Sequence, residues 1–423
     1  MNRRLSLFLL AGCVSSLLCA GTAAQTATSR TNWFASWAAA PLPYMPAPTP
    51  PGAAPPPPAS FPANTTLRQR VFPTVDGERV RVRFSNVFGT APLRVSQASI
   101  ARSTGGDAVS PNSLQALSFD GQKGVTIAPG AEAWSDAAPL AVRADQALAV
   151  SWYLESATPF GTAHHLPPGV SWATAGNAVM QATLPGASRP DWNHAVTGLD
   201  VAGPASARVV VAFGDSITEG VNAFAPVLTR YPDRLAERLR DPARKAAPVA
   251  VLNAGIAGNR LLSDWVGPSG LSRFERDVLR QSGVTHTVIL IGINDIGFVT
   301  LNGPPGSPVP SGPPVTAEQI CAGLQRLVDA ARKQGVKVLL GTLLPVKGSA
   351  YGTPENEAVR QAVNRWIRGR QEVDAVVDFD AVMRDPRDLQ RINPLYDSGD
   401  HLHPNDAGNA AMAAAIDPRE LRE

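Results

Sequence analysis

The sequence has little cysteine, and two of its three cysteines, Cys13 and Cys19, lie in an N-terminal segment with the features of a secretory signal. Without that segment the chain holds one thiol, Cys321, so a fold held by internal disulfides is excluded. The sequence also lacks a strong excess of charge, because 38 lysines and arginines stand against 35 aspartates and glutamates. This balance is no electrostatic footprint for nucleic acid, and no nucleic-acid partner is expected.

No apolar run is long and uninterrupted enough to predict a membrane-spanning helix, so an integral membrane protein is not expected. The first segment, "MNRRLSLFLLAGCVSSLLCAGTAA", has a basic start, an apolar stretch and small residues up to Ala24. It predicts a signal peptide over residues 1–24 and a secreted or periplasmic protein. The alternative is a lipoprotein, because "LAGC" resembles a bacterial lipobox that would place a lipid on Cys13.

The 423 residues exceed one ordinary domain. Proline is concentrated in "PLPYMPAPTPPGAAPPPPASFP" (Pro41 to Pro62), which cannot form a helix or a central strand. An extended, proline-rich N-terminal segment is therefore predicted over residues 25–65.

Residues 66–205 show the period of β-strands. In "RVRVRF" (79–84) and "QALAVSWYLES" (146–156), apolar residues alternate with arginine, small or polar residues. Period two means one buried and one wet face, so a jelly-roll-like β-sandwich of antiparallel strands is predicted. The arginine row in the first run is interpreted as a solvated strand face, with an acidic partner as the alternative.

From residue 207 the pattern changes to continuous apolar runs separated by helical stretches. The runs are "ARVVVAF" (207–213), "PVAVLN" (248–253), "HTVILI" (286–291), "KVLLGTLLP" (337–345) and "DAVVDF" (374–379). The helical stretches cover residues 230–240, 271–281, 317–335 and 355–371. This alternation predicts a parallel sheet covered on both faces, with its active site at the carboxyl ends of the strands.

Four polar motifs follow these elements in order. They are "FGDSITEG" (213–220), "NAGIAGNR" (253–260), "IGINDIG" (291–297) and "DHLHP" (400–404). A serine just past a buried strand and before a helix is placed as a nucleophile would be. Glycines in the second motif let backbone N–H groups point into a site without a Cβ in the way. Each motif alone is weak evidence, but four at successive element ends indicate a site.

The C-terminal half resembles the SGNH (GDSL-type) hydrolase family, through the blocks "GDSITEG", "NAGIAGN", "GIND" and "DHLHP". Their arrangement is similar to that of a secreted bacterial subgroup with a β-sandwich in front. The resemblance implies a flavodoxin-like, three-layer α/β/α domain with a five-stranded parallel sheet over residues 206–423. Ile217 stands where the family name implies leucine, which is a conservative difference.

The resemblance implies a role for five residues. Ser216 would be the nucleophile, His403 the base and Asp400 its partner. The backbone N–H groups of Ser216 and Gly258 and the side chain of Asn294 would form the oxyanion hole.

The chemistry of the residues agrees with these roles. A serine needs a neutral imidazole to take its proton, and the imidazole needs a group that orients it. An aspartate three residues before a histidine can fold back and hold the ring, and His403 has Asp400 at that spacing. His401 has no aspartate there, so its side chain is expected to point elsewhere.

Further residues beside the motifs are candidate substrate contacts. They are Asp215, Asn259, Arg260, Asp295 and His401. For Arg260, an ion pair with Asp264 is favoured over a substrate contact.

A metal site is the alternative for the histidine loop. Its ligands would come from Asp397, Asp400, His401, His403 and the pair His164 and His165. The sequence lacks an H-E-x-x-H pair and a glycine-punctuated acidic loop, so neither a metal nor a cofactor is expected.

The predicted function is that of a secreted serine esterase that hydrolyses short-chain, acetyl-type esters on a carbohydrate, through a Ser–His–Asp triad and an acyl-enzyme. A lipase or arylesterase acting on simple esters is the alternative. A non-catalytic glycan-binding protein is an alternative of another class, and the complete set of serine, histidine, aspartate and asparagine argues against it.

Overall fold

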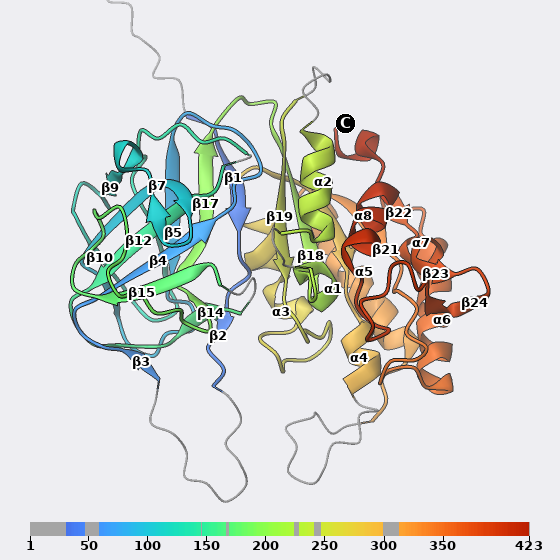
Figure 1. Cartoon of the computed structure of the whole chain (residues 1–423). Coiled ribbons are helices and arrows are strands. Elements are labelled where there is room, and N and C mark those ends of the chain that lie inside the picture. Colours follow the sequence, from blue (N-terminus) through green and yellow to red (C-terminus); the bar gives the residue numbers. More distant parts are fainter. Residues whose placement is uncertain are drawn as a thin grey trace, which may run out of the picture. The chain divides into compact units, whose positions relative to one another are not determined.

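Two kinds of β-sheet follow one another along the chain in the computed structural model, coloured from blue to green and then from yellow-green to red in Figure 1. The structure describes residues 31–46, 59–144, 146–165, 169–223, 228–240, 247–298 and 313–422. The expected signal peptide over residues 1–24, with Cys13, and much of the proline-rich stretch lie outside these residues.

The first half contains two antiparallel sheets. One has the strand order β1 (Trp33–Ala38), β17 (Val196–Ala202), β5 (Val80–Ser85) and β11 (Glu132–Trp134). The other has the order β15 (Ser171–Ala175), β4 (Thr65–Val71), β12 (Leu148–Leu154), β7 (Gln97–Gly105) and β8 (Ala108–Val109), with β9 (Gln115–Leu117) also on β7.

Small sheets complete this half. They are β2 (Leu42–Pro43) with β14 (Thr162–His164) and β16 (Asn193–His194), β3 (Ser60–Phe61) with β13 (Thr158–Pro159), and β6 (Leu93–Val95) with β10 (Val125–Ile127).

The sandwich core lies between the two large sheets. Val80, Val82 and Phe84 of β5 are fully buried, and the Phe84 ring meets Trp152 of β12 edge to face at 5.9 Å. This is the alternation that the period of two predicted, and the β-sandwich is confirmed.

Strand β1 lies in the segment that we expected to be proline-rich and extended. It precedes the proline run, and its side chains are mostly buried because it pairs along β17. The sheet therefore takes its edge strand from residues before the predicted start of the sandwich at residue 66.

The arginine row is not a fully solvated face, because Arg79 just before β5 is exposed but Arg81 is partly buried and Arg83 is buried. Arg81 donates to Asp200 of β17 at 3.0 and 2.7 Å and stacks on the rings of Trp33 and Trp134. It also reaches Ser282 at 3.3 Å, just before the second half's strand β20. The acidic partner of Arg81 is thus Asp200 of the same chain.

The second half is built on a parallel sheet with the strand order β19 (Val249–Gly255), β18 (Arg208–Gly214), β20 (Val284–Leu290), β21 (Lys337–Gly341) and β22 (Ala375–Val377). Residues 209–213 of β18 are fully buried, as a central strand covered on both faces requires. The five-stranded parallel sheet is confirmed.

Helices cover this sheet in a three-layer α/β/α arrangement. The longer ones are α2 (Tyr231–Leu239), α5 (Ala317–Lys333), α6 (Pro354–Arg368) and α8 (Asp406–Ala415). The shorter helices are α1 (Ser216–Glu219), α3 (Gly270–Phe274) continuing into the π-helical η2 (Glu275–Leu279), α4 (Ile293–Gly297) and α7 (Phe379–Met383). A hairpin of β23 (Arg384–Asp385) and β24 (Asp388–Ile392) and the 3-10 turn η4 (Pro418–Leu421) complete this half. The other 3-10 turn, η1 (Pro111–Ser113), lies in the first half. Helix α2 packs with α8, and α5 packs with both α3 and α6.

The strand order brings three motifs to one edge. Because β18 lies between β19 and β20, the loops that follow these three strands start side by side at their carboxyl ends. Ser216, Gly258 and Asn294 lie just beyond these ends, where ligands bind in open α/β sheets. Within the described residues, no helix is long and apolar enough to cross a membrane.

Candidate active site

Ser216 begins a short helix directly after the central strand. Asp215 caps this helix by accepting from the Ile217 N–H at 3.1 Å, and Gly220, with φ of +93°, ends it. As the first helical residue, Ser216 has no partner for its own N–H inside the helix. A Cβ at Gly214 would overlap Thr218 and the Leu290 carbonyl, so only glycine allows this sharp turn from strand to helix.

His403 and Asp400 complete a hydrogen-bonded chain to this serine. His403 Nε2 lies 2.8 Å from Ser216 Oγ, and His403 Nδ1 lies 2.6 Å from Asp400 Oδ2. The Asp400 side chain also accepts from the backbone N–H of His403 at 2.8 Å. The structure thus brings together the three residues named as nucleophile, base and orienting acid.

Several donors keep Asp400 ionised. Partial burial raises the pKa of Asp400, but the N–H of His403, its ring and the N–H of Leu402 more than offset this and hold the pKa at about 2. Asn222 donates to Oδ2 at 3.3 Å, and Ser398 donates to Oδ1 at 3.1 Å. An ionised carboxylate accepts only, so the Nδ1 of His403 carries its proton and the Nε2 presents a lone pair to Ser216.

His401 also has a carboxylate partner, which the sequence spacing did not reveal. Its Nδ1 lies 2.5 Å from Asp397 Oδ2, and its N–H donates to Asp397 Oδ1 at 3.0 Å. The backbone of His401 is left-handed, with φ of +60°, and its ring lies against Gly348. Asp397 stands four residues before His401, not three, so the spacing that identified Asp400 as the partner of His403 did not reveal this pair.

The two other oxyanion candidates lie on adjoining loops. Gly258 has φ of +76°, and a Cβ there would meet Val266 at 2.8 Å, so glycine is required. The amide nitrogen of Asn294 donates to the carbonyl of Asn259 at 3.0 Å, and its oxygen accepts from the Tyr351 hydroxyl at 2.9 Å. These two bonds fix which way the amide points and leave it a second N–H.

Tyr351 and Arg273 are parts of the site that sequence reasoning missed. The buried Arg273 guanidinium donates to the Gly214 carbonyl at 2.6 Å, to the Ala254 carbonyl at 2.8 Å and to Asn259 Oδ1 at 2.9 Å. It therefore ties the ends of β18 and β19 to the glycine loop. These three partners lie in two segments far from α3 in the sequence, so the local pattern around Arg273 gives no signal of this role.

Four candidate substrate contacts are buried and bonded inside the protein. The Asn259 side chain donates to the carbonyls of Val266 and Pro268 at 2.8 Å in addition to its bond with Arg273. Asp295 accepts from the N–H groups of Leu261 and Leu262 at 2.6 and 2.9 Å. This bonding favours structural roles for Asn259 and Asp295.

Asp215 and Arg260 both interact with the buried carboxyl group of Asp295. Burial raises the pKa of Asp215 to about 7, the Ile217 N–H opposes this, and the nearby Asp295 carboxylate adds to it. Arg260 Nε lies 3.9 Å from Asp295 Oδ1, whereas Asp264 instead accepts from the Ser269 N–H at 2.7 Å. The ion pair expected between Arg260 and Asp264 is therefore replaced by one with Asp295.

An aromatic cluster lies beside the glycine loop. The rings of Trp265 and Phe298 pack edge to face at 4.3 Å, and Phe298 meets Tyr351 at 5.7 Å. Phe298 also lies 3.6 Å from the position of a Cβ at Gly258. The side of the site next to Gly258 and Asn294 is thus walled by rings.

The acids and histidines of the C-terminal loop are divided between two pairs, Asp400 with His403 and Asp397 with His401. His164 and His165 have other partners: His164 contacts Ala40 and Glu219, and His165 packs on Trp192. Among the described residues, no group of three or more His, Cys, Asp or Glu side chains could hold a metal ion.

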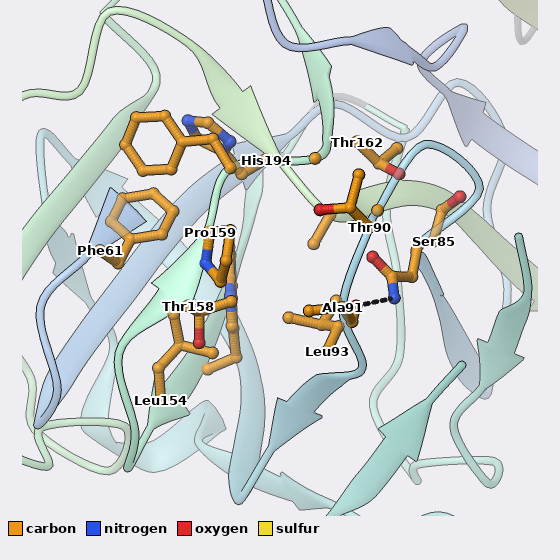
Figure 2. Close-up of a pocket in the computed structure, with 16 residues that line it drawn as sticks. Phe61, Ser85, Thr90, Ala91, Leu93, Leu154, Thr158, Pro159, Thr162 and His194 are labelled. Atoms are coloured by element: carbon orange, nitrogen blue, oxygen red, sulfur yellow. Dashed lines mark hydrogen bonds between the residues drawn. The ribbon is translucent and has the colours of Figure 1, made fainter. Parts of the chain in front are cut away.

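A separate pocket lies in the sandwich half, lined by Phe61, Phe160, His194 and neighbouring residues (Figure 2). Its volume of about 30 Å³ holds one or two water molecules and is too small for a sugar ring. None of the candidate catalytic residues lines it.

Comparisons with known proteins agree with the motifs. The model of the GDSL-like Lipase/Acylhydrolase family matches residues 212–411. None of the curated proteins that were compared matches the chain.

Solved structures similar to this chain cover about half of it. A GDSL-like lipase from Bacteroides thetaiotaomicron is 21% identical over 51% of this chain and 89% of its own, with a TM-score of 0.34. A lipase/acylhydrolase from Enterococcus faecalis is 22% identical over 51% and 95%, with a TM-score of 0.38. An acetyl xylan esterase variant from Geobacillus stearothermophilus is 23% identical over 52% and 95%, with a TM-score of 0.38.

The matched region begins within β18, which ends two residues before Ser216, and extends past His403, so it contains the whole hydrogen-bonded chain from Asp400 to Ser216. Residues 212–411 therefore form a GDSL-like Lipase/Acylhydrolase domain, and the protein is an ester-hydrolysing enzyme.

Proposed function

We propose that this protein is a secreted serine esterase that removes short acyl groups, chiefly acetyl, from a carbohydrate. The observation that carries the catalytic part is the unbroken chain of hydrogen bonds from Asp400 through His403 to Ser216 Oγ. Secretion rests on the signal-like segment over residues 1–24, and the substrate class rests on the polar character of the loops around Ser216.

In the first step, Ser216 Oγ attacks the ester carbonyl while His403 Nε2 takes the hydroxyl proton. Asp400 holds Nδ1 and stabilises the imidazolium that forms. The C–O bond to the alcohol then breaks, His403 gives its proton to the departing oxygen, and an acyl-enzyme remains on Ser216. In the second step His403 takes a proton from water as the water oxygen attacks the acyl carbon. The bond from that carbon to Ser216 Oγ then breaks, His403 returns the proton to Oγ, and the acid leaves.

Three donors stabilise the negative oxygen of the tetrahedral intermediates in this proposal. They are the backbone N–H groups of Ser216 and Gly258 and the side-chain amide of Asn294. The bonds from Asn294 to the Asn259 carbonyl and from Tyr351 to Asn294 hold the amide before the substrate arrives. Donors fixed in advance do not have to reorganise as charge develops, which is the main source of their effect.

Two features support a short acyl group. The rings of Trp265, Phe298 and Tyr351 pack against one another beside Gly258 and occupy space that a long chain would need. The polar residues Asn222, Ser398 and Asp400 are hydrogen-bonded to one another next to His403, with Asn222 and Asp400 exposed and Ser398 partly buried. Each added methylene would then gain little of the roughly 0.8 kcal/mol that full burial provides.

The test is hydrolysis of p-nitrophenyl esters with two, four and eight carbons in the acyl group, followed by acetylated oligosaccharides. We expect the acetyl ester to be cleaved fastest and the octanoyl ester slowest. Ser216→Ala should fold and lose nearly all turnover, and a phosphonate inhibitor should label Ser216 alone. An active alanine variant would refute the serine mechanism, and a rate maximum at eight carbons would favour the lipase alternative.

A further inference from the structure

A buried histidine of the sandwich meets a buried carboxyl group of the helix that begins at Ser216. His164 lies on β14, and Glu219 is the last residue of α1; their residues are 7% and 1% exposed. His164 Nε2 lies 3.3 Å from Glu219 Oε1, and His164 Nδ1 lies 2.8 Å from the Ala40 carbonyl. No step of the proposed reaction uses either side chain.

The geometry of His164 determines where its protons are. A carbonyl oxygen only accepts, so Nδ1 must carry a hydrogen to approach Ala40 at 2.8 Å. In a neutral ring Nε2 is then a lone pair, and at 3.3 Å it faces an oxygen of Glu219. Two lone pairs do not hold this contact in a buried site, so one proton lies between Nε2 and Oε1.

The surroundings favour a neutral ring. Burial lowers the pKa of His164 to about 4, the bond to Ala40 opposes this, and the positive charge of Arg230 adds to the lowering. His165 also lowers it and Asp277 raises it. The charges of Arg230 and Arg273 also act on the Glu219 carboxyl group, so the proton is shared between Nε2 and Oε1 and is not assigned to one of them.

The second oxygen of Glu219 reaches the glycine loop. Oε2 accepts from the N–H of Ala257, the residue before Gly258. A Cβ at Gly255 would overlap the backbone of Glu219, so the end of β19 and helix α1 are in direct contact here. One carboxyl group thus joins the helix of the nucleophile, the loop of Gly258 and a histidine of the sandwich.

We propose that His164 is a positioning residue of the sandwich half: through Glu219, it holds the Ala257–Gly258 segment so that the Gly258 N–H points at the developing oxyanion. This inference rests on the proposed function, because it assigns Gly258 its oxyanion role. It also gives the sandwich a part in catalysis that needs no ligand of its own.

Two substitutions of His164 separate its two contacts. In His164→Asn the amide nitrogen stands in for Nδ1, so the bond to Ala40 remains and the contact with Glu219 is lost. In His164→Gln the amide nitrogen stands in for Nε2 and donates to Glu219, while the bond to Ala40 is lost. We expect kcat for p-nitrophenyl acetate to fall about 10-fold in the Asn variant and less than about 3-fold in the Gln variant, because a displaced donor costs less than the 10²- to 10³-fold of a deleted one.

Substitutions of Glu219 test the shared proton. Glu219→Gln supplies an amide N–H toward His164 and an oxygen toward Ala257 without needing that proton, so it should keep at least half of the wild-type kcat. Glu219→Ala should lower kcat by about 10- to 100-fold with KM within about twofold, since only transition-state stabilisation is lost. His286→Gln, at a buried histidine on β20, is the matched control and should leave kcat and KM unchanged.

Hydrogen exchange at the peptide that contains Ala257 and Gly258 gives a readout independent of turnover. Exchange should quicken in His164→Asn and Glu219→Ala and stay at the wild-type rate in the two Gln variants. Unchanged exchange and unchanged kcat in His164→Asn would overturn the positioning role, and equal damage by Glu219→Gln and Glu219→Ala would overturn the shared proton. A wild-type protein without esterase activity would refute the proposed function, and the exchange rates would still decide the linkage.

Discussion

Two Asp–His pairs lie in the same C-terminal loop, and only one of them reaches a nucleophile. In both pairs a carboxylate holds Nδ1 of the ring, at 2.6 Å for Asp400 and His403 and at 2.5 Å for Asp397 and His401. His403 continues to Ser216 Oγ, whereas the ring of His401 lies over Gly348 with 39% of its side chain exposed. Both pairs thus contain an oriented imidazole, and they differ in that only the Nε2 of His403 contacts the Oγ of Ser216.

The two pairs also differ in their backbone. Asp400 precedes its histidine by three residues and Asp397 precedes its histidine by four, and His401 has a positive φ of +60°. Each aspartate also accepts from the backbone N–H of its own histidine. Each carboxylate therefore holds both the backbone and the ring of its histidine, and both pairs stabilise the conformation of the loop.

The largest test of this comparison is to remove each ring. His403→Ala should lower kcat by roughly 10⁴- to 10⁶-fold, since triad members act as a unit. His401→Ala should cost less than about tenfold, because its ring does not face Ser216. The measurement is kcat for p-nitrophenyl acetate, with thermal unfolding to show that both variants fold. The reverse order of effects would show that the pairs had been assigned the wrong way round.

Changing each carboxylate to an amide is the next test. In Asp400→Asn the amide can donate to Nδ1, which moves the ring proton to Nε2 and removes the lone pair that Ser216 needs; kcat should fall by about 10²- to 10⁴-fold. Asp397→Asn makes the same change in the other pair and should lower kcat less than about threefold. Similar losses in both variants would mean that the aspartates act only by holding the loop.

A smaller effect is expected at the oxyanion donors, which serve only the pair that reaches Ser216. Asn294→Ala should lower kcat by roughly 100- to 1000-fold with little change in KM. Tyr351→Phe removes the hydroxyl that orients the Asn294 amide and should cost about tenfold, also in kcat. A rise in KM with kcat preserved would make Asn294 a binding residue instead.

The smallest effect concerns a histidine that has no carboxylate hydrogen-bonded to its ring. Burial lowers the pKa of His286 on β20 to about 4, below the value of about 6.5 in an unfolded chain. As pH falls from 6.5 to 4 the unfolded state takes up this proton first, so the wild type should lose up to about 1.4 kcal/mol of stability per pH unit relative to His286→Gln. Urea unfolding of both proteins at pH 7, 5.5 and 4.5 measures this difference, and parallel curves would contradict it.

The elements of this fold could be predicted because they depend on local pattern. Alternation in residues 79–84 and the continuous run in residues 207–213 distinguish a strand with one buried face from a strand buried on both. What pattern could not predict is what covers a face. The arginine row on β5 resembles a solvated surface, and its partners Asp200, Trp33 and Trp134 come from three other strands.

The candidate site divides in the same way. Ser216, His403, Asp400, Gly258 and Asn294 stand in recognisable blocks, and their places at the strand ends follow from the topology. Their supports carry no such signal, because Arg273, Tyr351 and Asn222 become neighbours of the site only after the sheet and its loops have formed. Asp397 was named as an acid near the loop, but its bond to His401 depends on a left-handed turn that the spacing does not reveal.

The pairing of β1 with β17 has a consequence for the order in which the protein folds. Trp33 pairs with Ala202, so the four-stranded sheet is completed only when two segments at opposite ends of the first half of the chain come together. Such a contact carries a large loop-closure cost, which slows its formation compared with the neighbouring strands. During synthesis β1 leaves the ribosome before every other described strand and has no partner until β17 follows. Among the described strands of the sandwich, the first to be synthesised must therefore be among the last to pair.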